Sequence, residues 1–398
     1  MSELQACDVL IAGAGPAGLL LARLLAQAGA SVLVVDPLSD LRQSAFSSAA
    51  LPLAAVQQFQ LPEAVQAARW RGWELHGPAH QPYSWMADHA LGAVLDFGEL
   101  RLWLAARAEA AGARLQLGWA VRQWQGCASG ASASLRGPGG AERVQHCRWL
   151  VDATGQRRAL LGDPPRAAGS LVSGEGVEWL LQVPMQQWQR WADRLSFMLG
   201  STWVPQGYGW VFPMQCGQLK LGVCRLHDAS RHQPPLHQLL RGLQHRLDLE
   251  GAVVVDRHGG LIRSTIRRRE PHQRGPLLGL GDAVSTGNLL GGEGIRHAMA
   301  SSEVLAPLLL EALAGRPERL QRYAPRLKRR LGWRWSLSGR LARRTWLGLH
   351  SPAGDQRLQR LLQGLQQNSS AEELSALLFD YRFERYGLKA LPYLLGWR

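Results

Sequence analysis

The sequence predicts an α/β fold in which a central parallel sheet is joined to an antiparallel sheet and followed by a helical C-terminal region. Three observations support this expectation. The chain opens with a strand, a glycine-rich turn, a helix and a second strand; strand-like runs recur through residues 170–255; and residues 316–398 are helical and basic. With 398 residues, 46% of them hydrophobic, the chain can bury two or three cores.

The opening segment has the pattern of a dinucleotide-binding βαβ unit. An apolar run at residues 9–11 precedes the turn, a helical stretch follows at 19–28, and a second apolar run at 32–35 ends in Asp36. The first glycine of such a turn makes a tight bend, the second admits a pyrophosphate, and the third lets helix and strand pack closely. We expect the helix N-terminus to face phosphates and Asp36 to bind a ribose. The turn itself is Gly13, Ala14, Gly15, Pro16, Ala17 and Gly18.

The pattern along the chain suggests four segments. Residues 1–165 form the first part of the nucleotide-binding domain, with an insertion around 60–95 that belongs to the substrate domain. Residues 166–262 form an antiparallel substrate-binding sheet, and residues 263–315 return to the nucleotide-binding domain. Residues 316–398 form the basic helical region.

Composition limits the classes of partner. The formal net charge of +14 suits nucleic acid, an anionic membrane surface or an anionic substrate, but no nucleic-acid-binding motif accompanies it, so nucleic acid is not expected. The five cysteines show neither a CxxC pair nor metal-ligand spacing, so we expect no metal and a reducing, cytoplasmic setting. No apolar run reaches the length of a membrane span, and the oligomeric state stays open.

Two later motifs narrow the cofactor. Asp152-Ala153-Thr154-Gly155 ends a mid-chain strand, and Gly281-Asp282-Ala283 ends a later one. A glycine-rich turn, Gly291-Gly292-Glu293-Gly294-Ile295, then opens a helix. Together with the first turn, this order resembles the FAD-dependent oxidoreductases of the glutathione-reductase-type fold, in the branch of geranylgeranyl reductases, lycopene cyclases and flavin halogenases.

The resemblance implies that FAD is the cofactor and indicates which residues hold it. The aspartate after the late strand would bind a ribitol or ribose hydroxyl, and the following turn would present N–H groups to the flavin. An arginine at the start of the helix near residue 100 is expected to face the cofactor. The expected FAD-binding residues are Gly13, Gly15, Pro16, Ala17, Gly18, Asp36, Arg42, Arg101, Ala153, Gly155, Gly281, Asp282, Gly291, Gly292, Glu293, Gly294 and Ile295.

A fourth motif concerns the substrate. Tyr208-Gly209-Trp210-Val211-Phe212-Pro213 is similar to the Y-x-W-x-F-P element of geranylgeranyl reductases. Alternation along a strand places Tyr208, Trp210 and Phe212 on one face, where the resemblance implies that they line a substrate cavity. An aromatic core strand would show the same pattern. One departure is the loop at residues 42–50, which lacks the Cys-Gly-Gly sequence of those reductases.

The resemblance implies hydride transfer from reduced flavin to a carbon–carbon double bond of an isoprenoid or lipid-like substrate. Tyr208 and His297 are the candidate proton carriers. A lycopene-cyclase-like reaction assisted by Glu293, a monooxygenase or halogenase reaction, and a non-catalytic flavin protein that binds lipid or pigment remain as alternatives. Because the sequence holds one nucleotide fingerprint, electrons would come from transiently bound NAD(P)H or from a protein donor.

The basic tail contains an amphipathic segment at residues 327–349. On a helix its apolar side carries Leu327, Leu331, Trp335, Leu341 and Trp346, and its basic side carries Arg329, Arg340, Arg343 and Arg344. Such a segment can lie on an anionic membrane surface or pack on the protein with its basic side in solvent. We therefore expect a cytoplasmic protein with peripheral membrane contact as one outcome.

Overall fold

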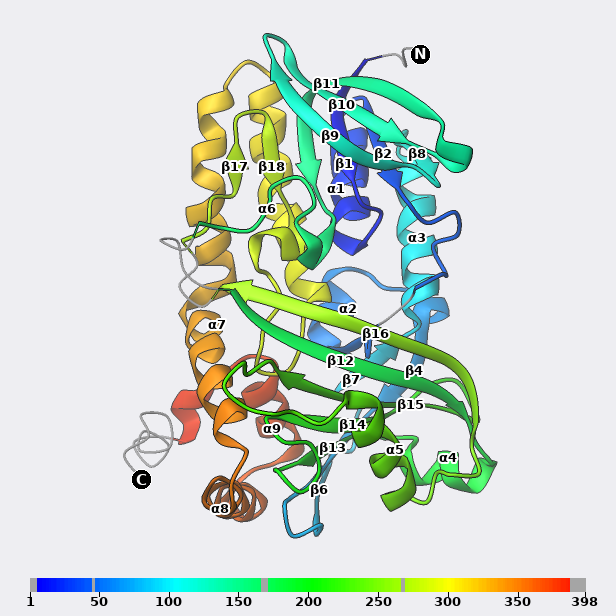
Figure 1. Cartoon of the computed structure of the whole chain (residues 1–398), viewed down its shortest axis with the longest axis vertical. Coiled ribbons are helices and arrows are strands. Elements are labelled where there is room, and N and C mark those ends of the chain that lie inside the picture. The colour runs from blue at the N-terminus through cyan, green and yellow to red at the C-terminus, as the bar shows by residue number, and fades with distance from the viewer. Residues whose placement is uncertain (1–5, 45–46, 166–170, 266–268, 387–398) are drawn as a thin grey trace.

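The computed structural model describes residues 6–44, 47–165, 171–265 and 269–386. Within them, eight strands form one sheet in the upper half of Figure 1 and seven form another in the lower half. A third, three-stranded sheet consists of β3 (Ala50–Pro52), β7 (Gly92–Leu95) and β4 (Gln66–Trp70). The chain therefore has the expected α/β architecture.

The eight-stranded sheet carries the parallel core. Its strands run in the order β17 (Gln273–Arg274), β18 (Leu277–Gly279), β11 (Glu142–Asp152), β1 (Cys7–Ala12), β2 (Val32–Asp36) and β8 (Arg114–Leu117). The pairs from β18 to β8 are parallel, and β17 runs against β18. The antiparallel strands β9 (Ala120–Cys127) and β10 (Gly130–Arg136) precede β11 in the chain, and β10 pairs with β11.

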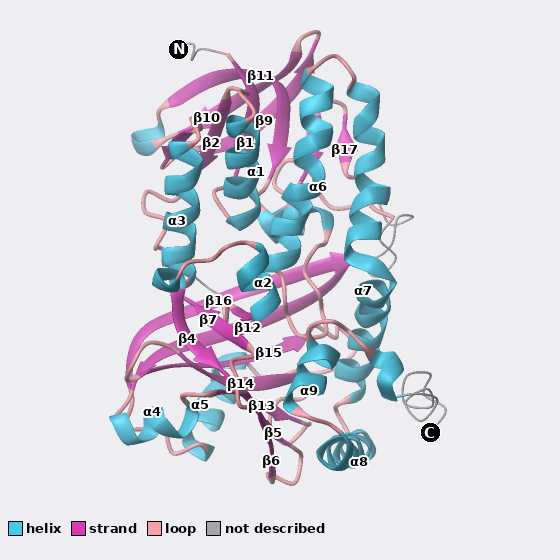
Figure 2. Ribbon diagram, turned by 180° about the vertical axis from the view of Figure 1, so that it is seen from behind, coloured by secondary structure: helices cyan, strands magenta, loops and turns pink. Residues whose placement is uncertain are grey.

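Helices cover one face of this sheet. The helix α1 (Pro16–Gln27) packs against α3 (Phe97–Ala110) and α6 (Ile295–Leu313), which lie in front of the strands in Figure 2. The strands β1 and β2 are almost continuously apolar and buried, as parallel strands between two layers must be. The short helix α2 (Leu53–Gln58) follows β3.

The seven-stranded sheet has the order β16 (Val253–Thr265), β12 (Leu171–Gln182), β15 (Gln218–Leu226), β14 (Gly207–Pro213), β13 (Arg194–Leu199), β5 (Gly72–His76) and β6 (Pro82–Met86). It is antiparallel except where β13 and β5 pair in parallel. Through that pair the sheet gains β5 and β6, which come from an earlier stretch of the chain and end the sheet on that side. The strand β16 continues to Thr265, past the expected division after residue 262.

The two faces of this sheet have different neighbours. Apolar residues of β14 and β15 on one face, including Val211 and Leu221, form a core with α5 (Leu236–Arg246), near α4 (Met185–Trp191). The other face, called here the inner face, carries Tyr208, Trp210 and Phe212 and packs partly against α8 (Pro352–Asn368) and α9 (Ala371–Leu378). The expected shared face of these three aromatic residues is confirmed.

A long helix connects the two sheets. The helix α7 (Tyr323–Gly348) runs beside both halves of the molecule in Figure 1, and Gly332 interrupts its helical geometry with a φ of 82°. Its residues Leu327, Trp335 and Leu341 are buried in the protein. The apolar side of the amphipathic segment therefore packs inward. None of the described helices combines the length and hydropathy that crossing a membrane requires.

Candidate active site

The first glycine turn follows β1 and contacts the segment that follows β11. A Cβ on Gly13, whose φ is +116°, would stand 2.3 Å from the carbonyl oxygen of Ala153, and one on Gly18 would stand 2.1 Å from the carbonyl oxygen of Gly13. Gly15 differs, because no atom lies within 4 Å of its Cβ position. Gly13 and Gly18 thus serve the protein's own packing, whereas Gly15 leaves open space at the N-terminus of α1.

The acid at the end of β2 is tied to this turn. The Asp36 carboxylate accepts hydrogen bonds from the backbone N–H groups of Ala14, at 2.7 Å, and Leu38, at 2.9 Å. These bonds fix the carboxylate beside the open turn. Its remaining lone pairs are available to a ligand, since each carboxylate oxygen can accept more than one bond.

The mid-chain turn is organised by Asp152, which is fully buried at the end of β11. Its carboxylate accepts bonds from the Thr154 hydroxyl, at 2.6 Å, and from the N–H groups of Leu160 and Leu161, at 3.0 and 2.8 Å. Gly155 follows with a φ of +67°. Asp152 therefore shapes the loop that holds Ala153 against the first turn.

Arg158, which sequence reasoning missed, links this loop to the late turn. Its guanidinium is buried and donates to the carbonyl of Ala283 and to the hydroxyl of Ser285, each at 2.6 Å. The signal that could have found it is an arginine three residues after Gly155, but only the fold shows its partner more than 120 residues away.

The late turn places Asp282 against the glycine-rich segment. Thr286 donates its hydroxyl to Asp282 at 2.7 Å, and a Cβ on Gly294 would stand 3.6 Å from the same carboxylate. Burial raises the pKa of Asp282. Gly291 has open space around its Cβ position, as Gly15 has. The turn therefore has room for a planar group over its backbone.

A network of charged groups supports this turn from the first residues of α6. Glu293 is paired with Arg296, lies 3.5 Å from His297 and accepts a 2.9 Å bond from the Tyr381 hydroxyl. Burial by itself would raise the pKa of Glu293, but the charges of Arg296 and His297 lower it to about 2. Glu293 is therefore ionised at neutral pH.

Tyr381 comes from the chain after α9 and was assigned no role from sequence. Its hydroxyl is 3.2 Å from Nε2 of His297, and its backbone has a φ of +56°. Arg296 also donates to the carbonyl of Phe379. The C-terminal segment thus returns to the N-terminus of α6 and encloses His297, whose ring also meets Trp335 edge-on.

The aromatic strand β14 reaches the same turn. The Tyr208 hydroxyl lies 3.0 Å from the Cβ position of Gly292. The rings of Tyr208 and Trp210 are 5.9 Å apart, and those of Trp210 and Phe212 are 6.4 Å apart. The structure therefore brings the expected substrate residues together with the expected flavin turn.

The two arginines expected at the cofactor lie together near the loop after β2. Arg42 is exposed and pairs with Glu99, with 3.2 Å between Nε and Oε1. Arg101 is buried and donates to the carbonyl of Gln43 at 2.6 Å. From the opposite side, Lys220 donates to the carbonyl of Ser47 at 2.7 Å and so ties β15 to this loop. Lys220 was not predicted from sequence.

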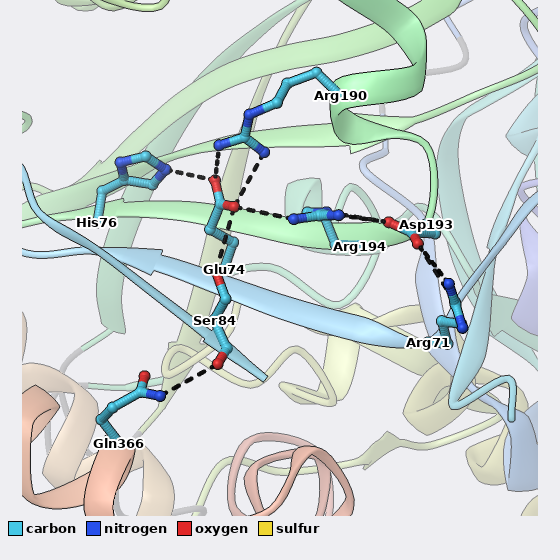
Figure 3. Close-up of polar contacts among 8 residues, drawn as sticks. All are labelled: Arg71, Glu74, His76, Ser84, Arg190, Asp193, Arg194 and Gln366. Atoms are coloured by element: carbon cyan, nitrogen blue, oxygen red, sulfur yellow. Dashed lines mark hydrogen bonds and ion pairs between the residues drawn. The ribbon is translucent and has the colours of Figure 1, made fainter. Parts of the chain in front are cut away.

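A second buried ion network lies away from this site (Figure 3). Glu74 of β5 accepts bonds from Arg190, at 2.7 and 3.0 Å, from Arg194 at 3.2 Å and from His76 at 2.8 Å. Alternation along β5 turns Glu74 away from Trp73, which packs in the aromatic core of the inner face. This network joins β5, β13 and α4 and serves the fold.

Comparisons with known proteins agree with this geometry. The family described as FAD binding domain matches residues 6–48. The digeranylgeranylglycerophospholipid reductase of Methanocella arvoryzae is 25% identical over 82% of this chain and 83% of its own length. The menaquinone reductase of Mycobacterium tuberculosis is 29% identical over 78% of each chain. This chain is an FAD-dependent oxidoreductase that is similar in sequence to reductases of geranylgeranyl lipids and of menaquinone.

Solved structures show the same fold for this flavoprotein. A geranylgeranyl bacteriochlorophyll reductase-like protein from Thermoplasma acidophilum superposes with a TM-score of 0.78 at 20% identity, covering 96% of this chain and 98% of its own. A myxobacterial chondrochloren halogenase gives 0.67 at 15% identity, covering 99% and 91%. The open spaces at Gly15 and Gly291, each beside a helix N-terminus that no side chain caps, fit FAD as the cofactor.

Proposed function

We propose that this flavoprotein reduces a carbon–carbon double bond in an isoprenoid chain. The observation that carries the proposal is the meeting of Tyr208 with the turn at Gly292, which puts an aromatic face next to the expected flavin position. An apolar chain is the substrate class that such a face suits. Relatives named as reductases of digeranylgeranylglycerophospholipid and of geranylgeranyl diphosphate support the same class.

The residues of this chain have separate tasks in the proposed reaction. FAD, when bound, supplies the hydride. The turns at Gly13–Gly18 and Gly291–Gly294 and the carboxylates of Asp36 and Asp282 hold the cofactor. Tyr208, Trp210 and Phe212 orient the apolar chain and exclude water. The positive end of the α6 dipole would favour negative charge on a flavin ring bound near the helix N-terminus.

The proton must come from another group. Tyr208 and His297 are the carriers expected from sequence, and both are buried near Gly292 and Glu293. Burial raises the pKa of Tyr208 well above its usual value, so its proton is held tightly. His297 is enclosed by Tyr381 and Trp335. The reductant of the flavin would be transiently bound NAD(P)H or a protein electron donor.

We also propose peripheral contact with anionic membrane through α7. Because its apolar residues are buried in the protein, the contact would be electrostatic rather than inserted. Arg340, Arg343 and Arg344 are exposed on the outer side of α7, and Trp333 is 63% exposed. Such a surface would hold the enzyme where long isoprenoid lipids partition.

An anaerobic half-reaction tests the reductase proposal. The purified flavoprotein is reduced with dithionite and mixed with micelles that contain a digeranylgeranyl glycerophospholipid or menaquinone. We expect at least one lipid to reoxidise the flavin and to gain two hydrogens in its isoprenoid chain. Fragment mass spectra must place them in the chain, because reduction of the menaquinone ring to the quinol also adds two hydrogens. If neither lipid reoxidises the flavin, while oxygen yields a hydroxylated or, with halide present, a halogenated aromatic product, the monooxygenase or halogenase alternative replaces the proposal.

A further inference from the structure

The inner face of the seven-stranded sheet carries a buried carboxyl that the proposed reaction has not used. Glu178 lies in the middle of β12 and is 1% exposed. In the strand register it is directly opposite His258 of β16 on one side and Gly222 of β15 on the other. Gly222 in turn is opposite Trp210 of β14. The four residues therefore form one row across four strands.

Gly222 makes a contact across this row possible. A Cβ at Gly222 would stand 2.1 Å from the Trp210 ring, so the indole lies over the space that the missing side chain leaves. The indole Nε1 thereby reaches across β15 and donates to Oε2 of Glu178 at 2.9 Å. This hydrogen bond fixes the orientation of the Glu178 carboxyl. The Trp210 ring therefore lies between that carboxyl and the Tyr208 ring, its neighbour on the aromatic face.

The groups that face Glu178 come from three strands. Lys220 of β15 and His258 of β16 act on it through their charges, and Trp210 of β14 acts through its hydrogen bond. Burial raises the pKa of Glu178 above its usual value, and these three groups only oppose that effect. The Lys220 ammonium also donates a hydrogen bond to the carbonyl of Ser47. The carboxyl is thus positioned to hold a proton.

A route to solvent leads from Glu178 toward the sheet edge. His258 has 14% of its side chain exposed, and its Nε2 lies 3.1 Å from Oδ2 of Asp256, whose side chain is 55% exposed. Both belong to β16, the outermost strand at this side of the sheet. A buried acid, a partly exposed imidazole and an exposed carboxylate therefore follow one another from interior to surface.

We propose that Glu178 donates the proton that completes reduction of the double bond, and that His258 returns a proton to it. This inference rests on the proposed reductase function. One carbon of the double bond receives the hydride, and the other receives the proton as the O–H bond of Glu178 breaks and its electron pair stays on oxygen. A solvent proton then passes by way of His258 to the carboxylate. Tyr208 is left to position the substrate.

The test compares Glu178→Gln with Glu175→Gln. The first change keeps an acceptor for Trp210 but removes the acidic proton. The second lies on the same strand but faces the other side, where Glu175 pairs with Arg225 at 2.6 Å. We expect both variants to bind FAD, and only Glu178→Gln to slow lipid-dependent flavin reoxidation at least 100-fold in a single turnover. A fall in rate of this size is typical when the general acid of a reaction is removed.

Two further measurements separate proton transfer from structure. The wild-type single-turnover rate falls as pH rises through the titration of Glu178, and Trp210→Phe moves that fall to higher pH because it removes a bond that stabilises the carboxylate. His258→Gln slows the later turnovers more than the first one. In flavin-free protein at neutral pH, the infrared difference spectrum of wild type minus variant shows a protonated carboxyl band for Glu178→Gln and none for Glu175→Gln.

The outcomes distinguish this inference from the proposed function. If wild-type protein reduces the lipid and Glu178→Gln does so at the same rate with the same pH profile, the Glu178 assignment is overturned while the reductase function stands. If the infrared band of Glu178 is present but no lipid reoxidises wild-type flavin, the reductase function fails. A missing band in wild-type protein at neutral pH also overturns the assignment, whatever the activity.

Discussion

The hydroxyl oxygen of Tyr208 lies 3.0 Å from the position that a Cβ on Gly292 would take. Gly292 has a φ of +65°, a backbone conformation that side chains other than glycine rarely adopt. The inner face of one sheet and the glycine-rich turn of the other half of the molecule therefore touch at this point. On the proposed function, this contact limits how near an isoprenoid chain on the aromatic face can come to the turn at residues 291–294.

Gly292→Ala is expected to disturb this contact. The new methyl group meets the Tyr208 hydroxyl, and the backbone at this position must keep a φ that is unfavourable for alanine. We therefore expect a loss of about 1–2 kcal/mol in unfolding free energy and weaker FAD binding. Gly291→Ala is the matched control for stability, because its Cβ position is open within the protein. Urea unfolding of flavin-free protein measures the stability of both variants, and flavin absorbance per chain measures FAD binding by Gly292→Ala. Equal unfolding free energies of the two flavin-free variants would contradict the contact.

Gly15→Val tests the cofactor turn without testing the fold. Since nothing lies within 4 Å of the Gly15 Cβ position, flavin-free protein should melt at an unchanged temperature, whereas FAD binding should be lost because the side chain fills the pyrophosphate position. Gly18→Ala is the contrast, because its Cβ would stand 2.1 Å from a backbone oxygen and should lower the melting temperature without any flavin. A Gly15→Val protein that purifies with a normal flavin spectrum would refute the assignment.

The local motifs of this fold could be predicted from sequence, and the contacts between distant residues could not. Each glycine turn is encoded by residues a few positions apart, and the structure places the turns of Gly13 and Ala153 in contact. The bond from Trp210 to Glu178 depends on β15 lying between their strands. The bond from Tyr381 to Glu293 depends on the chain returning after α9. Local sequence patterns predict neither the order of the strands nor the return of the chain to Glu293.

The amphipathic segment shows the same limit. Periodicity correctly grouped Leu327, Trp335 and Leu341, but it left open whether a membrane or the protein covers them. The structure buries all three in the protein. Periodicity shows which residues avoid water, and only the packing of α7 against α6 and β15 shows what covers them.

Arg296→Gln is expected to destabilise the turn at Glu293. The change removes the charge that keeps buried Glu293 ionised, so the pKa of Glu293 should rise from about 2 and unfolding free energy should fall by about 3–5 kcal/mol at pH 7. The double variant with Glu293→Gln should recover part of that loss, because no uncompensated charge remains. Denaturation at pH 7 measures both. The control is Arg316→Gln, because Arg316 is exposed and pairs with Glu311 of α6. A double variant no more stable than the single one would contradict the coupling.

Glu74→Gln is expected to weaken the network of Figure 3. Burial would raise the pKa of Glu74, but hydrogen bonds from His76 and Arg190 lower it to about 2. Because the pKa is lowered from 4.5, the stabilisation is complete above pH 4.5 and is lost as pH falls toward 2. Wild-type protein should exceed the variant by about 2 kcal/mol at pH 7, and the difference should shrink below pH 4.5. Glu63→Gln, in an exposed pair with Arg69, should change little.

Removal of three charges from α7 tests membrane contact. Each basic side chain near an anionic surface contributes about 1 kcal/mol, so replacing Arg340, Arg343 and Arg344 by Gln should weaken partitioning up to about a hundredfold. Sedimentation with vesicles of phosphatidylserine and phosphatidylcholine measures the effect, and added salt should reduce binding of the wild type. The control carries the same charge loss at three exposed arginines of other elements, Arg122, Arg136 and Arg241. If both triple variants lose binding equally, net charge and not the α7 surface is responsible. If neither variant loses binding, α7 does not mediate the membrane contact.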